Sequence, residues 1–116
     1  MGKDELKYRA YKFSLEIVKF VASLSKDRIT QIIAMQLLKC GTSVGANVVE
    51  AQSGTSRKDF INFYSIALKS ANETKFWLCL LRDSKISKSN RCLHLLEETV
   101  EIAKIIGQSI LTMKGK

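Results

Sequence analysis

Proline is absent from this chain of 116 residues, and glycine occurs only six times. These are the residues that most often interrupt helices, because proline lacks a backbone N–H and glycine is costly to order. No segment alternates apolar and polar residues between turn residues, which excludes the usual pattern of a half-buried strand. The sequence therefore predicts an all-α fold made of long helices.

Cysteine is scarce. There are three, at positions 40, 79 and 92, and none forms a C-x-x-C pair. An odd and widely spaced set excludes a disulfide framework. We expect reduced thiols that pack as small apolar side chains, which is typical of a cytoplasmic protein.

Long apolar runs are also missing. The longest, near residues 32–38, contains Gln36 and is far shorter than the roughly 20 residues that span a bilayer. Lysine and arginine interrupt every apolar run in the first thirty residues, so no secretory signal is readable. We expect no membrane partner.

Four helical segments are predicted within one domain, residues 1–116, a length that supports a single core. Polar breaks separate them, and connections this short join antiparallel neighbours, which predicts an up-down-up-down four-helix bundle. The second helix is expected to end at Gly54 in the left-handed conformation. The N-caps expected for the second, third and fourth helices are Ser25 or Asp27, Thr55 or Ser56, and Ser87 or Ser89.

Apolar residues at spacings of three and four mark the face of each helix that is expected to be buried. These positions are Leu6, Ala10, Phe13, Ile17, Phe20 and Leu24; then Phe60, Phe63, Ala67, Ser70, Thr74, Trp77 and Leu81; then Leu93, Leu96, Val100, Ala103 and Ile110.

Six consecutive apolar residues, positions 76–81, cover the full circumference of the third helix. A lone bundle would leave some of them in water, and large exposed apolar patches usually mark interfaces. We therefore expect a homo-oligomer, with an unusually wide core face as the alternative. The expected interface residues are Phe76, Trp77, Leu80 and Leu81.

Nineteen basic residues against eleven acidic ones give a net charge of +8, which attracts polyanions. The excess is uneven, since residues 29–54 carry only one lysine and one glutamate. No known RNA-binding module is readable, so recognition through the phosphate backbone or overall shape is the most that the sequence supports. The candidate nucleic-acid contacts are Lys12, Lys19, Lys26, Arg57, Lys58, Lys69 and Lys75.

Catalytic and cofactor motifs are not found, and neither an enzyme activity nor a cofactor is expected. Every helix carries a glutamate, which leaves a carboxylate-bundle metal protein as a remote alternative. Such sites need two Glu-x-x-His motifs, however, and His94 is the only histidine and has no glutamate three residues before it. Cys92 and His94 lie about 200° apart on one helix, which excludes a Cys–His pair within one chain.

The second helix carries a stripe of small and polar residues at helical spacing, which includes Cys40, Ser43, Asn47 and Glu50. Small side chains let a neighbouring helix approach, and buried polar groups need hydrogen-bond partners. Residues 42–51 read TSVGANVVEA, and with Gln36 and Leu37 they resemble the signature of a bacterial family known as the 23S rRNA intervening-sequence proteins, or S23. Residues 56–61 and 66–74 resemble its second block, and the resemblance covers most of residues 6–110.

That resemblance implies an antiparallel bundle that assembles as a homopentameric ring and has no established enzyme activity. The family is also similar to the accessory variability proteins of diversity-generating retroelements, which are basic pentamers that work with a reverse transcriptase and its template RNA. The stripe and the two blocks together predict a helix-packing set of Gln36, Ser43, Asn47, Glu50, Phe60, Ala67 and Glu73.

We therefore expect a non-catalytic, basic, oligomeric protein that binds nucleic acid or acts as a scaffold, associated with structured RNA or with DNA. A reverse transcriptase is a further possible partner that the resemblance implies. The alternative is an adaptor that docks other proteins through the apolar surplus around Trp77 and has no nucleic-acid role.

Overall fold

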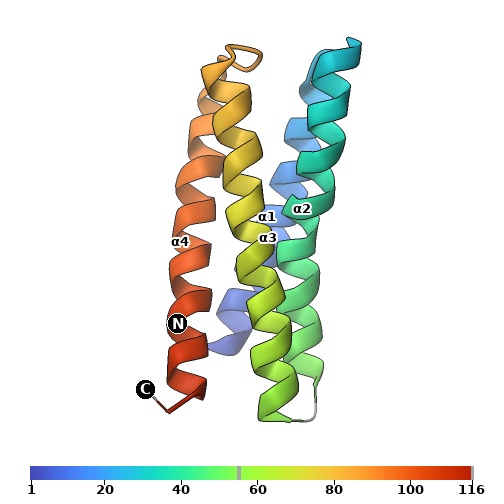
Figure 1. Ribbon diagram of the computed structural model, residues 1–116. Coiled ribbons are helices and arrows are strands. Elements are labelled where there is room, and N and C mark those ends of the chain that lie inside the picture. The colour runs from blue at the N-terminus through green and yellow to red at the C-terminus, as the bar shows by residue number, and fades with distance from the viewer. Residues whose placement is uncertain (55, 116) are drawn as a thin grey trace.

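A computed structural model describes residues 1–54 and 56–115 and contains four helices, α1 (Lys3–Ser23), α2 (Arg28–Ser53), α3 (Arg57–Asp83) and α4 (Asn90–Met113). They form a rod of 45 × 20 × 19 Å (Figure 1). No strand occurs within the described residues. The predicted all-α class and four-helix architecture are confirmed.

The helix starts follow the expected capping chemistry. The Asp27 carboxylate accepts hydrogen bonds from the Thr30 N–H at 3.0 Å and the Thr30 hydroxyl at 2.9 Å. Ser56 and Ser89 accept the backbone N–H of Asp59 and Arg91, at 3.0 and 2.9 Å. The alternative cap Thr55 lies outside the described residues.

The predicted left-handed end of α2 is wrong. Gly54 has φ −71° and ψ 158°, an extended conformation that any residue can adopt. Positive φ values occur instead at Lys85 in the α3–α4 connection, with φ 63°, and at Gly115 after α4, with φ 75°.

Core positions agree best in α1, where all six predicted residues are buried. In α3, Phe63, Ser70 and Trp77 lie at the edge of the core. The residue that follows each of them is buried, namely Tyr64, Ala71 and Leu78. In α4 the stripe is rotated, so Leu93 is 44% exposed and Val100 and Ala103 are half-buried. Helix α4 is apolar enough to offer two stripes, and packing selects Cys92, Leu95, Leu96, Thr99, Ile102, Ile106 and Ile110.

The backbones of α1 and α2 approach closely at two buried glycines of α2. A Cβ atom added to Gly41 would lie 2.9 Å from Ile17, and one added to Gly45 would lie 2.9 Å from the Ala10 carbonyl oxygen and collide with the Ser14 hydroxyl. Only glycine therefore fits at these positions without movement of α1.

On its other side α2 meets α3 through small polar residues. The Ser70 hydroxyl donates to the Ser43 hydroxyl at 3.0 Å, and the Thr74 hydroxyl lies 3.4 Å from Cys40 Sγ. Asn47 adds bonds to the Ser43 carbonyl and hydroxyl, at 2.8 and 3.0 Å. The small-residue stripe thus packs α2 between α1 and α3.

Three members of the predicted helix-packing set do not belong to it. Gln36, Glu50 and Glu73 are exposed, because at about 100° per residue they are rotated beyond the contact surfaces of their helices. Phe60 and Ala67 are buried, and Ser43 and Asn47 are half-buried between helices, as predicted.

The contact between α1 and α4 is the least extensive of the four between neighbouring helices. It includes a two-pronged ion pair, in which Arg9 Nε and Nη2 donate to the two Glu98 carboxylate oxygens at 2.8 and 2.7 Å. Both side chains remain more than a quarter exposed.

Two Gly→Ala substitutions separate helix propensity from close packing. Gly107→Ala adds a Cβ with nothing within 4 Å, so it is expected to stabilise α4 by up to about 1 kcal/mol. Gly45→Ala gains the same propensity but forces α1 outward, for a net loss of about 1–3 kcal/mol. Urea unfolding followed by circular dichroism measures both, and equal effects of the two substitutions would contradict the close approach.

Candidate functional site

The seven predicted nucleic-acid contacts are all exposed. Lys12 and Lys19 lie on one side of α1 and Lys26 lies just beyond its end, whereas Arg57, Lys58, Lys69 and Lys75 lie on α3. Helices α1 and α3 are not neighbouring helices of the bundle. A single subunit therefore does not gather these seven cations into one surface.

The structure instead brings basic residues together at one end of the rod. The α1–α2 and α3–α4 connections both lie at the upper end in Figure 1. These connections and the adjacent helix ends carry six exposed basic residues, which we call the basic end: Lys26, Arg28, Arg82, Lys85, Lys88 and Arg91.

The two acids in these segments are already engaged. Asp27 caps α2, and the hydrogen bond from the Thr30 N–H is the largest of the contacts that hold its pKa below the ordinary range. Asp83 accepts from Arg82 Nε at 2.7 Å, a bond that lowers the pKa of Asp83 and raises that of Arg82. Both carboxylates offset charge locally, and five of the six cations form no ion pair within the described residues, namely Lys26, Arg28, Lys85, Lys88 and Arg91.

The helix dipoles reinforce this asymmetry. Helices α2 and α4 begin at the basic end, and their first turns contain no acidic residue. Helices α1 and α3 begin at the opposite end, where Asp4, Glu5 and Asp59 lie in the first turns. Because a helix N-terminus carries a partial positive charge, the start of α4 can attract an anion, whereas the Asp27 carboxylate already caps the start of α2.

A short basic run in the sequence marks this end of the rod, although it is not one of the predicted nucleic-acid contacts. Residues 82–91 read RDSKISKSNR, with four basic residues and one acid. The run straddles the end of α3 and the start of α4, so no helical stripe reveals it. A hollow of about 370 Å³ lies there, lined by Arg82, Lys85, Ser87, Lys88, Ser89 and Leu93.

A second exposed surface is apolar and runs along α1 and α2. Gly45 of α2 lies in close contact with Ser14 of α1. The residues beside this contact on the solvent side of each helix therefore lie next to one another. Their exposed fractions range from 36% to 59%. We call this surface the α1–α2 outer face: Tyr11, Leu15, Val18, Ile32, Met35 and Val49.

Helix α2 is also the one helix of the described residues that is long and apolar enough, by length and composition alone, to cross a membrane. The core helix of a bundle passes the same test, and nine residues of α2 are buried against its neighbours. The apolar character of α2 is therefore explained by its packing against α1 and α3 and by its share of the α1–α2 outer face.

The predicted interface on α3 is only partly exposed. Phe76 and Leu80 are 58% and 38% exposed, and the ring of Phe76 packs edge-on against Trp77 with centroids 5.0 Å apart. Leu81 is fully buried, so its assignment to an interface is wrong. Leu81 directly follows the exposed Leu80, and the rotation of about 100° per residue places it on the core side of α3. We call Phe76, Trp77 and Leu80 the α3 patch.

The described residues contain no group of three or more His, Cys, Asp or Glu side chains that could hold a metal ion. Glu98, which could share a face with His94 and Glu101, is instead paired with Arg9. The Cys92 thiol points to the Leu78 carbonyl at 3.5 Å, whereas His94 is exposed. The structure therefore does not join Cys92 to His94.

Comparison with known proteins gives a family and a fold. The model of a family described as 23S rRNA-intervening sequence protein matches residues 3–108. The chain is also similar to a crystal structure of a protein of unknown function from the S23 ribosomal protein family of Bacteroides thetaiotaomicron. The identity is 34%, the TM-score is 0.87, and the match covers 95% of this chain and 98% of that one. No curated protein shows significant similarity.

The three thiols are expected to differ in reactivity. Burial raises the pKa of both Cys40 and Cys92 and limits their access to reagents, whereas Cys79 is half-buried. Titration of the native protein with a thiol reagent at pH 8 should modify Cys79 first, and Cys79→Ser should remove that phase. Prior modification of Cys40 or Cys92, identified by mass spectrometry, would contradict the described packing and indicate an activated thiol.

Proposed function

Because this chain belongs to the 23S rRNA-intervening sequence protein family, we propose that it is a non-enzymatic cytoplasmic protein that self-associates and binds the phosphate backbone of structured RNA. The observation that carries the binding half is the basic end, where six cations meet two helix N-termini with no acid in their first turns. The preference for RNA over DNA rests on the family name alone.

Backbone binding suits the side chains available at this end. Lysine and arginine neutralise phosphates, and the N–H groups of a helix start donate hydrogen bonds to an anion. Base readout in single strands usually needs exposed aromatic platforms, and the six residues of the basic end include none. We therefore propose a binder that is sensitive to salt and insensitive to sequence, to which Lys12 and Lys19 on α1 add charge.

Self-association follows from two apolar surfaces on different helices. A two-fold dimer uses the same patch on both copies, whereas a ring joins two different patches of successive copies. The α1–α2 outer face and the α3 patch are two such surfaces. We propose that they meet between copies in a closed ring, and the family resemblance suggests five subunits.

The antiparallel up-down-up-down order is part of the same proposal. Gly45 lies against Ala10 and Ser14, whereas Gly41 lies against Ile17. The residue numbers of the contacts therefore rise along α1 as they fall along α2. The pairs Ser43–Ser70 and Cys40–Thr74 support the same opposite direction for α2 and α3. A reverse transcriptase as partner remains an expectation from the resemblance. The basic end supports it only in that both proteins would bind the same RNA.

RNA binding is expected to depend on where charge is removed. The double variant Lys88→Gln/Arg91→Gln should weaken binding to an RNA hairpin roughly tenfold and reduce the salt dependence, log K against log salt, by about 1–2 in slope. Fluorescence anisotropy at a series of salt concentrations measures both. The matched control Arg57→Gln/Lys58→Gln removes the same charge at the opposite end and should have less effect.

Equal losses in the two double variants would show that net charge alone attracts RNA and would contradict a role for the basic end. No binding of RNA or duplex DNA by the unmodified protein, even at low salt, would leave the protein-adaptor alternative.

Assembly is expected to fail when either surface is charged. Leu15→Glu on the outer face and Phe76→Glu on the α3 patch should each lower the sedimentation coefficient from that of an oligomer to that of a 13.1 kDa monomer. An equimolar mixture should form dimers, because one copy keeps the surface that the other lacks. Leu111→Glu, at an exposed leucine of α4, is the control and should leave the assembly intact.

A dimer that survives Phe76→Glu would contradict the ring and favour a two-fold contact through the outer face. An unmodified protein that sediments as a monomer at all concentrations would contradict self-association altogether.

A further inference from the structure

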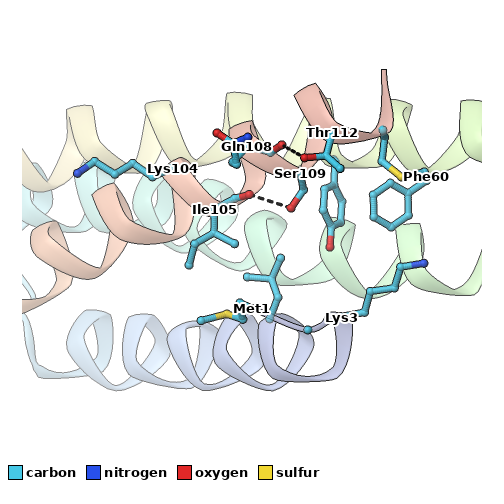
Figure 2. Close-up of a pocket in the computed structure, with 12 residues that line it drawn as sticks. Met1, Lys3, Phe60, Lys104, Ile105, Gln108, Ser109 and Thr112 are labelled. Atoms are coloured by element: carbon cyan, nitrogen blue, oxygen red, sulfur yellow. Dashed lines mark hydrogen bonds between the residues drawn. The ribbon is translucent and has the colours of Figure 1, made fainter. Parts of the chain in front are cut away.

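A cavity lies at the end opposite the basic end, where the start of α1 diverges from the end of α4 (Figure 2). Its volume is about 690 Å³, within the range of small-molecule sites. It is lined by apolar side chains from three helices and neither the proposed RNA surface nor the two apolar faces extends into it. These apolar residues are Met1, Leu6, Phe60, Ile105 and Met113.

Tyr64 lines this cavity with a hydrogen bond left to donate. The residue is 1% exposed, and its ring is held against Phe60 with centroids 4.2 Å apart. Gln52 Nε2 donates to the Tyr64 hydroxyl oxygen at 3.3 Å and to the Lys3 carbonyl at 2.9 Å. The phenol proton has no acceptor among the described residues, and burial raises the pKa of Tyr64, which keeps that proton in place.

The other hydroxyl groups of the cavity are already used. Ser109 donates to the Ile105 carbonyl at 2.8 Å and Thr112 to the Gln108 carbonyl at 3.0 Å, both within α4 (Figure 2). The Tyr64 hydroxyl is therefore a buried donor in this cavity that an incoming acceptor can satisfy at no cost to an existing bond.

The charges at the cavity have one sign. Lys3 and Lys104 are among its twelve lining residues, and none of the twelve is acidic. Lys3 Nζ lies 5.1 Å from the centre of the Phe60 ring, a position that holds its charge at the cavity rim. An apolar interior, a buried donor and cations at the rim together match a molecule with an apolar body and an anionic end.

We propose that this cavity binds an amphipathic monocarboxylate of the medium-chain fatty acid class. The alkyl chain lies among the apolar residues, and the carboxylate accepts a hydrogen bond from the Tyr64 hydroxyl and faces Lys3 or Lys104. This site is independent of RNA binding and of the ring contacts, so its test does not depend on either.

Isothermal titration calorimetry of the full chain with decanoate at pH 7.5 provides the test, with decanol and decyltrimethylammonium as uncharged and cationic probes. Decanoate should bind at least about tenfold more tightly than either, because only it can accept a hydrogen bond as an anion. Tyr64→Phe should remove about that tenfold preference, since it deletes the donor and keeps the ring.

Matched variants separate the cavity from general effects. Tyr11→Phe changes an exposed tyrosine and should leave decanoate binding unchanged. Ile105→Trp should fill the cavity and abolish binding, whereas Leu111→Trp, at an exposed site of the same helix, should not. Circular dichroism and thermal unfolding confirm that each variant is folded.

Three results would overturn the proposal: no decanoate binding, equal binding of decanoate and decanol, or decanoate binding that Tyr64→Phe and Ile105→Trp leave unchanged. Each of them is compatible with RNA binding at the basic end, so failure here and failure of the proposed function are distinguishable.

Discussion

The close approach of α1 and α3 to the two sides of α2 is the constraint on which the rest of the structure depends. Gly41 and Gly45 leave no room for a Cβ beneath α1, and Ser43, Cys40, Ser70 and Thr74 bring α3 near on the other side. Helix α1 is thereby committed to α2, and its contact with α4 is correspondingly limited and includes the Arg9–Glu98 pair. The cavity at the far end lies where these two helices separate.

This arrangement also gives the two ends of the rod different electrostatics. At one end, α2 and α4 begin without acids in their first turns, and lysine and arginine occupy the two connections and the adjacent helix ends. At the other end, Asp4, Glu5 and Asp59 offset the helix dipoles. A ring of such subunits that presents the same end on one side would gather the basic ends, since repeated like charges strengthen the field that attracts a polyanion. Self-association and RNA binding therefore support each other in the proposed function.

Much of the fold could be predicted from the sequence because local rules decide it. The spacing of Leu6 through Leu24 is a single stripe, and the capping residues Asp27, Ser56 and Ser89 act through bonds within one turn. Sequence alone was insufficient where tertiary contacts choose between alternatives. Helix α4 has two possible apolar stripes, so Leu93 was placed inside although it is exposed. Gln36, Glu50 and Glu73 were assigned to helix packing from the family resemblance, but they are exposed and do not pack helices within one chain.

The functional surfaces were harder to predict for a related reason. Lysines on one helix stripe are easily seen in a sequence, but the basic end joins two loops that are more than fifty residues apart. The α1–α2 outer face could have been found from the spacing of Tyr11, Leu15 and Val18 opposite the core stripe of α1. Its continuation on α2 depends on the register set by Gly45, which only the structure supplies. Tyr64 lies outside the predicted stripe of the third helix, and its free proton depends on the orientation of Gln52.

Lysine acetylation footprinting with and without an RNA hairpin, read by mass spectrometry, locates the contact surface in the unmodified protein. The proposed function predicts that RNA protects Lys26, Lys85 and Lys88 while Lys58 and Lys114 at the opposite end remain reactive. Protection of Lys58 and Lys114 with continued reactivity of Lys26, Lys85 and Lys88 would contradict it.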